Sequence, residues 1–244
     1  CSSDLDMRKI KNSDVIIVKG CYDYIERVFK AADMKYALTS NNSLENIDIN
    51  PDQTIFINCP GEVPRLGLRK LVEFVKNGGF LFTTDWALTN IIEKGFPGYI
   101  RHNKKTTGDE VVKVQVVGND PFLNTLIESK ENPLWWLEGS SYPIEIINHE
   151  KVEILVNSRE IKRKYGEAPV FVTFEYGKGK IYHMISHFYL QRSEARDSRD
   201  NLSGASYLNE KLNMDANKSY KYADMLDDDT NLSEVESAFS STAI

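Results

Sequence analysis

The first 100 residues alternate between short apolar runs and amphipathic segments. The run DVIIVKG (14–20) is rich in β-branched residues, and in CYDYIERVFKAADM, which follows it, apolar side chains recur at helical spacing. Further apolar runs lie at 35–40, 55–57 and 80–85, and the amphipathic segment VPRLGLRKLVEFVKNGG separates the last two. Apolar strands without polar alternation are typical of a parallel sheet that is buried on both faces. The pattern therefore predicts an α/β fold with helices on both faces of a mostly parallel sheet.

From residue 99 onward the pattern becomes strand-rich. VVKVQVV, PIEII and VEILVNS are strand-like, and VFVTFEY and KIYHMISHF are separated by a short Gly-containing turn that predicts a hairpin. We therefore expect antiparallel edge strands beside the parallel sheet. Beyond Arg192 the chain is polar and includes the acidic run Asp227–Asp229. We divide the sequence into an N-terminal extension (1–13), one domain (14–191) and a weakly helical or partner-docked polar tail (192–244).

Composition and charge narrow the classes of partner. Of the 244 residues, 41% are hydrophobic and 27% are charged, as in ordinary globular proteins, and no apolar run approaches the ~20 residues of a membrane-spanning helix. The net charge of −6 argues against a nucleic-acid partner, because affinity for phosphate backbones comes mainly from clustered Lys and Arg. We expect a protein partner or a small-molecule ligand, with no membrane span, and the sequence does not indicate the oligomeric state.

The three cysteines, Cys1, Cys21 and Cys59, form no CxxC pair and predict neither a disulfide framework nor a zinc site. A reducing compartment, the cytoplasm, fits this usage best. An alternative comes from the start CSSDL, which resembles a mature bacterial lipoprotein anchored through Cys1.

His183 and His187 share one face of a predicted strand but lie about 13 Å apart along it, too far to share one metal ion. We expect no metal and no cofactor.

The order of the elements resembles the class I glutamine amidotransferase-like superfamily, which has a flavodoxin-like sheet. The resemblance covers residues 14–191 and rests on a strand ending in NCPGE, a helix closing with NGG, the strand FLFTTD turning into a helix, and the hairpin GKGKIYHMISHF. It implies a reactive cysteine at the turn after FLFTT, where this chain has Thr84 or Asp85. It also implies a catalytic histidine at His187, followed by an acid where this chain has Tyr189. The resemblance therefore implies a pseudoenzyme: a non-catalytic binding or scaffold domain.

The predicted strand exits carry the candidate ligand-binding residues, because α/β proteins bind ligands at the carboxyl edge of the sheet. These residues are Gly20, Cys59, Gly61, Glu62, Asp85, Trp86 and His187. An alternative function is a hydrolase with Asp85 or Cys21 as nucleophile and His187 as base. Each candidate also has a structural explanation: Asp85 could cap the helix that starts at Trp86, and both cysteines could be packing or capping residues.

The segment PLWWLEGSSYPI is a candidate for a lid or for contact with a protein partner, and the alternative is that its aromatic side chains close the core. Adjacent residues of a strand point to opposite faces, so Trp135 and Trp136 cannot both face the same side. We therefore expect at least one of these indoles to lie on a surface or in a cleft.

Overall fold

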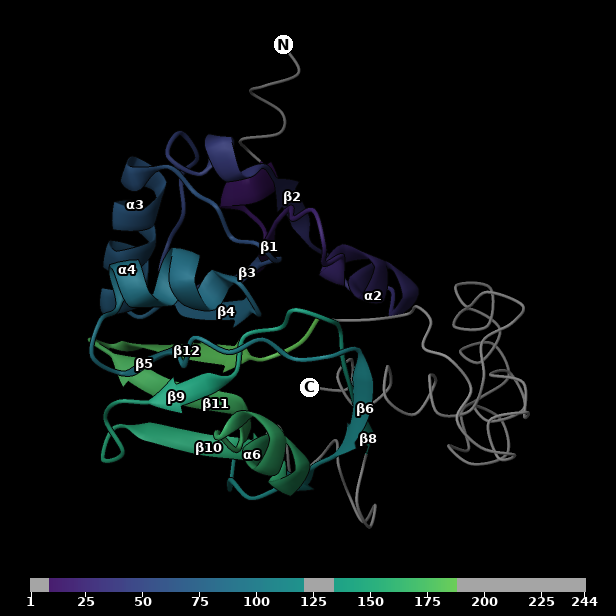
Figure 1. Ribbon diagram of the computed structural model, residues 1–244. Helices are drawn as coiled ribbons and strands as arrows, with labels where there is room; N and C mark the ends of the chain where they lie inside the picture. Colours follow the sequence, from purple (N-terminus) through teal and green to yellow (C-terminus); the bar gives the residue numbers. More distant parts are fainter. Residues whose placement is uncertain (1–8, 121–133, 188–244) are drawn as a thin grey trace.

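The computed structural model describes residues 9–120 and 134–187, and its centre is an eight-stranded sheet (Figure 1). The strand order is β2-β1-β3-β4-β12-β11-β10-β7. The strands are β1 (Val15–Val18), β2 (Ala37–Thr39), β3 (Thr54–Ile57), β4 (Phe80–Thr84), β7 (Gln115–Val116), β10 (Val152–Asn157), β11 (Pro169–Tyr176) and β12 (Gly179–Met184). The strands from β2 to β12 in this order pair in parallel, and those from β12 to β7 pair antiparallel. The predicted tail and Cys1 lie outside the described residues.

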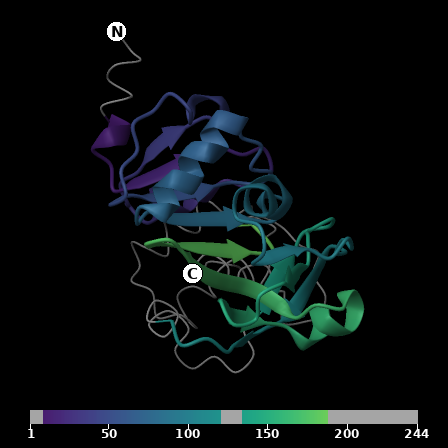
Figure 2. The same cartoon turned by 90° about the vertical axis from the view of Figure 1, so that its left-hand side faces the viewer.

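Helices cover both sides of the parallel half of this sheet. In Figures 1 and 2, α3 (Arg65–Lys76) and α4 (Glu93–Gly95) lie on one side, and α2 (Ile25–Ala31) lies on the other. The inward face of α3 buries Leu71, Phe74 and Val75. The π-helical turn η2 (Leu88–Ile92) follows β4, the 3-10 turn η1 (Asn41–Ser43) follows β2, and α6 (Arg159–Tyr165) follows β10. The predicted α/β class with a mostly parallel sheet is confirmed.

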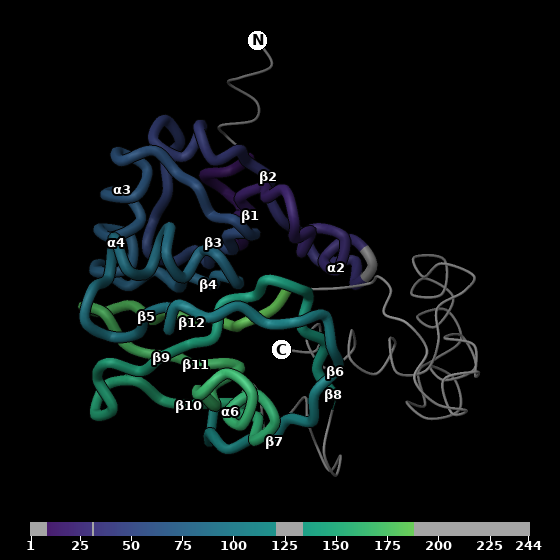
Figure 3. The backbone as a smooth tube through the Cα atoms, in the orientation of Figure 1, coloured from purple at the N-terminus to yellow at the C-terminus, as the bar shows by residue number. Residues whose placement is uncertain are grey.

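The hairpin of β11 and β12 places β12 inside the sheet. The chain turns at Gly177, whose φ of 63° is accessible to glycine at little cost. β12 then pairs in parallel with β4, from Lys180 opposite Phe80 to Met184 opposite Thr84. Figure 3 shows β12 between β4 and β11, with β7 at the far side of β10. The antiparallel strands β11, β10 and β7 therefore extend the parallel half on one side, as the sequence predicts.

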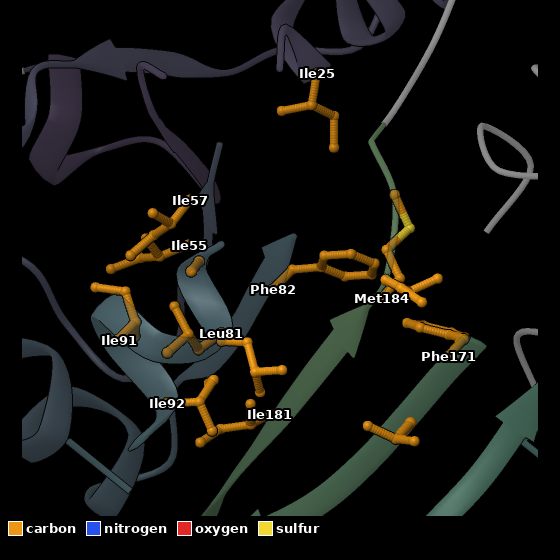
Figure 4. Close-up of a cluster of buried hydrophobic side chains, with 14 of the residues drawn as sticks. Ile25, Ile55, Ile57, Leu81, Phe82, Ile91, Ile92, Phe171, Ile181 and Met184 are labelled. Carbon is orange, nitrogen blue, oxygen red and sulfur yellow. The ribbon is translucent and has the colours of Figure 1, made fainter. Parts of the chain in front are cut away.

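Apolar side chains from these central strands form the core between sheet and helices. Figure 4 shows Ile55, Leu81 and Ile181, from three neighbouring strands, facing Ile91 and Ile92 of η2. All five side chains are buried. Burial at about 25 cal/mol per Å² of apolar surface makes this layer the main stabilising contribution to the sheet, and it holds the strand ends in fixed positions. Among the described residues, no helix is long and apolar enough to cross a bilayer.

Two small antiparallel pairs complete the domain, namely β5 (Ile100–His102) with β9 (Ile144–Ile146), and β6 (Glu110–Lys113) with β8 (Leu134–Leu137). The expectation that one indole of β8 is exposed or in a cleft is wrong, because Trp135 and Trp136 are both buried. Each indole N–H has an acceptor: Trp135 Nε1 donates to Ser186 Oγ (2.6 Å) and Trp136 Nε1 to Asp109 Oδ1 (2.7 Å). With these hydrogen bonds made, both faces of β8 can be buried without an unpaired polar atom.

Candidate functional site

Neighbouring parallel strands end at one edge of the sheet and bring four polar side chains to it. β1, β3, β4 and β12 are consecutive in the sheet, and the residues shortly beyond their carboxyl ends include Asp23, Cys59, Asp85 and His187. Ile57 pairs with Thr83, so continuing both strands by two residues places Cys59 beside Asp85. This is the edge at which α/β proteins bind ligands.

Three of these residues form a compact group, here called the Cys59–Asp85–His187 cluster. Cys59 Sγ, a carboxylate oxygen of Asp85 and a ring nitrogen of His187 all lie within 4.8 Å of one another. His187 Nε2 is 3.1 Å from Asp85 Oδ2. The three residues are only 1%, 2% and 3% exposed, respectively. Burying charged groups is costly, so this cluster is a strong candidate for a functional site.

Cys59 is held in place by the backbone of the neighbouring strand exit. Its carbonyl oxygen accepts hydrogen bonds from the N–H groups of Cys21 (3.0 Å) and Tyr22 (3.3 Å). A Cβ at Gly20 would lie 2.2 Å from that oxygen, so only glycine allows this close approach. Gly20 therefore positions Cys59 through the backbone.

Asp85 occupies the turn after β4, as expected, with a φ of 43°. Positive φ is uncommon outside glycine, although aspartate is among the residues that tolerate it. Its Oδ1 accepts from Tyr142 N (2.8 Å) and its Oδ2 from Ser141 Oγ (3.0 Å). The carboxylate is thus bonded to the segment that follows β8, and no side-chain cap stands at the start of η2.

His187 lies between two carboxylates. Asp85 lies next to Nε2 of the ring, and on the other side Nδ1 is 2.8 Å from Oε2 of Glu138. The side chain of Glu138 is 43% exposed. Burial alone would lower the pKa of His187. Hydrogen bonds with Asp85, Cys59 and Glu138, together with the charge of the buried Asp23, raise this pKa well above the ordinary histidine value. A negative potential at the cluster explains that direction, because it favours the charged imidazolium.

The pKa of the Cys59 thiol is also raised, which for a thiol favours the neutral form. Burial raises its pKa, while hydrogen bonding with His187 and with the Trp86 backbone N–H lowers it in part. The net direction is upward, so Cys59 is a neutral thiol when nothing else is bound. A nucleophilic cysteine requires a lowered pKa, and the pKa of this buried thiol is raised.

The other predicted site residues lie around the cluster. Cys21 is exposed and is not one of the clustered groups, and Glu62 is exposed on the loop after β3. Gly61 has a φ of 70°, and a Cβ there would meet Ala87 Cβ at 2.8 Å, so it shapes that loop. Trp86 is half-buried, and its Nε1 donates to Ser140 O (2.8 Å).

The sequence analysis missed four residues that support the cluster: Asp23, Glu138, Ser141 and Tyr142. Asp23 has a visible signal, since it lies a few residues after β1 at the same sheet edge. The other three follow β8, and no pattern in the sequence predicts that this segment folds over the ends of β4 and β12.

Comparison with known proteins adds information on the fold alone. No family model matches the chain, and no curated protein matches it. Among solved structures, a cytoplasmic protein from Salmonella typhimurium is 10% identical with a TM-score of 0.51, covering 87% of this chain and 98% of that one. The carbohydrate deacetylase Agd3 is 12% identical with a TM-score of 0.50, covering 86% and 32%.

A third similar structure is Gan42B, a GH42 β-galactosidase from G. stearothermophilus, at 13% identity and a TM-score of 0.47. The match covers 71% of this chain and spans 27% of the β-galactosidase chain. The amidotransferase resemblance is wrong: no family model supports it, and the similar structures with TM-scores of 0.50 and 0.51 are a carbohydrate deacetylase and a cytoplasmic protein. The pseudoenzyme expectation rested on that resemblance and is withdrawn with it. The resemblance failed because strand order and turn chemistry are shared by many α/β folds.

Proposed function

We propose that the Cys59–Asp85–His187 cluster binds a divalent metal ion of the zinc class. Thiolate sulfur, imidazole nitrogen and carboxylate oxygen are the three donor types that proteins offer to Zn²⁺. Donor atoms around a tetrahedral zinc ion are separated by about 3.3 to 3.6 Å, given metal–ligand distances of 2.0 to 2.3 Å. The observed 3.1 Å between His187 Nε2 and Asp85 Oδ2, and the 4.8 Å limit for the group, require only small side-chain adjustments. The sulfur donor argues against Mg²⁺ or Ca²⁺.

The observation that carries the proposal is the contact of Glu138 with His187. A metal-binding histidine usually donates its second ring N–H to a carboxylate, which fixes the ring and the tautomer. Glu138 Oε2 lies 2.8 Å from Nδ1, leaving Nε2 directed toward Asp85 and Cys59. Ser141 and Tyr142 similarly fix the carboxylate of Asp85. The donors are therefore oriented before any ion binds.

Electrostatics supports the same assignment. Asp85, Glu138 and Asp23 surround one imidazole, and their negative potential raises the pKa of His187. A potential that favours a bound proton also favours a bound metal cation. On binding, the thiol proton and one imidazole proton pass to solvent, so the net charge of the cluster stays constant when a dication enters.

The proposal narrows the sequence-based expectation of a binding domain, because the small ligand becomes a metal ion. It departs from the expectation of no metal, since the donors come from three strand ends and not from the pair His183 and His187.

We also propose the type of sheet and the cellular compartment. The sheet is a flavodoxin-like variant, and the chain works in a reducing cytoplasm, where the Cys59 thiol stays available to metal.

Cobalt substitution tests this proposal directly. Co²⁺ bound by a thiolate in a tetrahedral site gives a sulfur-to-metal charge-transfer band and intense visible d–d bands. A protein with Cys1→Ser and Cys21→Ser retains Cys59 as its only cysteine, so any charge-transfer band then reports this residue. We expect one equivalent of Co²⁺ to bind and Zn²⁺ to displace it.

The control variant is Cys59→Ser in the same background, in which the charge-transfer band should disappear. His187→Ala and Asp85→Asn should weaken binding of Co²⁺, with circular dichroism confirming that each variant is folded. Absence of the band from the folded Cys59-only protein would refute the proposal. Full retention of Co²⁺ affinity in both ligand variants would also refute it.

A further inference from the structure

We propose that the metal ion bound by the Cys59–Asp85–His187 cluster is catalytic, an inference that rests on the proposed function. The ion holds a water molecule at its fourth position, and the chain is an acyl hydrolase. Structural zinc sites have four protein ligands, whereas catalytic zinc sites have three and keep one position for water or substrate. Among the described residues, the group of candidate donors contains only Cys59, Asp85 and His187.

The nearest other polar groups already have partners. Asp23 Oδ2 accepts from Thr84 Oγ1 (2.6 Å), and Asp23 Oδ1 accepts from Tyr24 N (2.8 Å). Glu138 Oε2 is engaged by His187 Nδ1, where it acts as an orienting group. Neither carboxylate can become a fourth ligand without giving up a contact that the fold makes. Within residues 9–120 and 134–187 no other donor joins the group, so the proposal assigns the fourth position to water.

In this proposal substrate approaches past Glu138. The Glu138 side chain is 43% exposed while it contacts the buried His187, so it connects the cluster with the surface. Trp86, adjacent to Asp85 in sequence, is half-buried and stacks on Tyr142, with ring centroids 5.6 Å apart. Tyr22 meets the same indole edge-on at 5.3 Å and is exposed. An apolar wall beside a metal-bound water suits a neutral acyl group better than a highly charged substrate.

The chemistry follows from the Lewis acidity of the ion. Zinc lowers the pKa of a bound water to about 7, so hydroxide is available near neutral pH. The hydroxide oxygen forms a bond to the carbonyl carbon, and the carbonyl π electrons move to its oxygen, next to the ion. Collapse of this tetrahedral species would break the bond to the leaving alcohol or amine, which would take the proton of the added hydroxide and leave the acid product as a carboxylate. The acid product retains the water oxygen, and no oxidant or reductant is needed.

This route assigns new roles to the residues of the hydrolase alternative. Asp85 and His187 are ligands in place of nucleophile and base, and Cys21, exposed and outside the cluster, has no part. Cys59 is also a ligand, which agrees with its 1% exposure, since a ligand need only reach the ion while a nucleophile must reach the substrate. The attacking group is water, so no covalent acyl-enzyme forms.

The test uses p-nitrophenyl acetate as an activated acyl ester. The full chain is stripped with a chelator and then reloaded with Zn²⁺ or Co²⁺, and metal occupancy is measured separately by elemental analysis. We expect hydrolysis to be lost on stripping and restored in proportion to occupancy. This comparison needs no mutation, so folding of a variant does not affect it.

Glu138→Gln probes the orienting contact, with Glu150→Gln as the matched control, because Glu150 is an exposed carboxylate in the turn between β9 and β10. Measured at full occupancy, Glu138→Gln should lower kcat/KM by about 10- to 100-fold. Glu150→Gln should leave it unchanged.

The outcomes separate this inference from the metal-binding proposal. A fully loaded protein that hydrolyses the ester no faster than buffer with the same Zn²⁺ would overturn the hydrolase inference and leave metal binding intact. Hydrolysis that persists in stripped protein, or a trapped acyl adduct on Cys59, would overturn it in favour of a thiol mechanism. Failure to load any metal would overturn both proposals together.

Discussion

Replacing His183 with glutamine should remove a large part of the acid sensitivity of this fold. His183 is fully buried near the carboxyl end of β12, and its Nδ1 lies 2.8 Å from Thr83 Oγ1. Burial lowers its pKa from 6.5 to about 3, so the ring is neutral in the folded protein at pH values well above 3. In the unfolded chain the same ring takes up a proton below pH 6.5. Acid therefore favours unfolding, and the stability due to this residue falls as pH falls from 6.5 toward 3.

The size of the effect follows from the two pKa values. Each unit of difference corresponds to about 1.4 kcal/mol, so lowering the pH from 6.5 to 4.5 costs about 2 kcal/mol of unfolding free energy. His187 adds little in this window, because its raised pKa keeps it protonated when folded, and the unfolded ring also becomes protonated below pH 6.5. Carboxylates begin to titrate at the acid end of this window, but they contribute alike in wild type and in His183→Gln, so the difference between the two proteins isolates His183.

Urea unfolding followed by circular dichroism, in the presence of a chelator, measures this pH dependence. Wild type and the exposed-residue control His149→Gln should each lose about 2 kcal/mol more than His183→Gln between pH 6.5 and 4.5. His183→Gln should start less stable, because the contact with Thr83 changes, but should lose far less over the same interval. An equal pH dependence in His183→Gln and wild type would refute the reasoning.

Three further predictions concern the cluster and its supports. Gly20→Ala should cost about 1 to 3 kcal/mol in urea unfolding and weaken Co²⁺ binding, because the new Cβ would displace Cys59 O; unchanged affinity would contradict this. Trp135→Phe should cost about 1 to 3 kcal/mol, because it leaves the buried Ser186 hydroxyl without its indole donor; a neutral result would show that the hydrogen bond contributes nothing. Glu138→Gln should raise the Kd for Zn²⁺ by about 10- to 100-fold in a competition titration with a chromophoric chelator, and an unchanged Kd would exclude an orienting role.

Much of the fold was predictable because local patterns and the tertiary structure agree. The alternation of strands and helices up to β4, and the hairpin of β11 and β12, are visible as apolar periodicity and glycine turns. The buried pair Trp135 and Trp136 was not predictable, because their acceptors, Ser186 and Asp109, lie 51 and 27 residues away in sequence. Long-range hydrogen bonds of this kind leave no local signal.

The candidate site was predictable residue by residue but not as a group. Cys59, Asp85 and His187 each follow an apolar run, which marks them as strand-exit residues. Their proximity depends on the insertion of β12 next to β4, and sequence alone does not specify that strand order. Glu138 was missed for a related reason, since its role depends on how the segment after β8 packs over two strand ends.

The central claim is that Cys59, Asp85 and His187 share one metal ion. The most direct measurement is anomalous X-ray diffraction at the zinc absorption edge, from crystals of the zinc-loaded full chain. The account predicts a single strong anomalous peak bounded by Cys59 Sγ, Asp85 Oδ2 and His187 Nε2, at about 2.0 to 2.3 Å from each. A cluster without a peak in zinc-loaded crystals, or zinc bound elsewhere while Cys59 remains a free thiol, would contradict it.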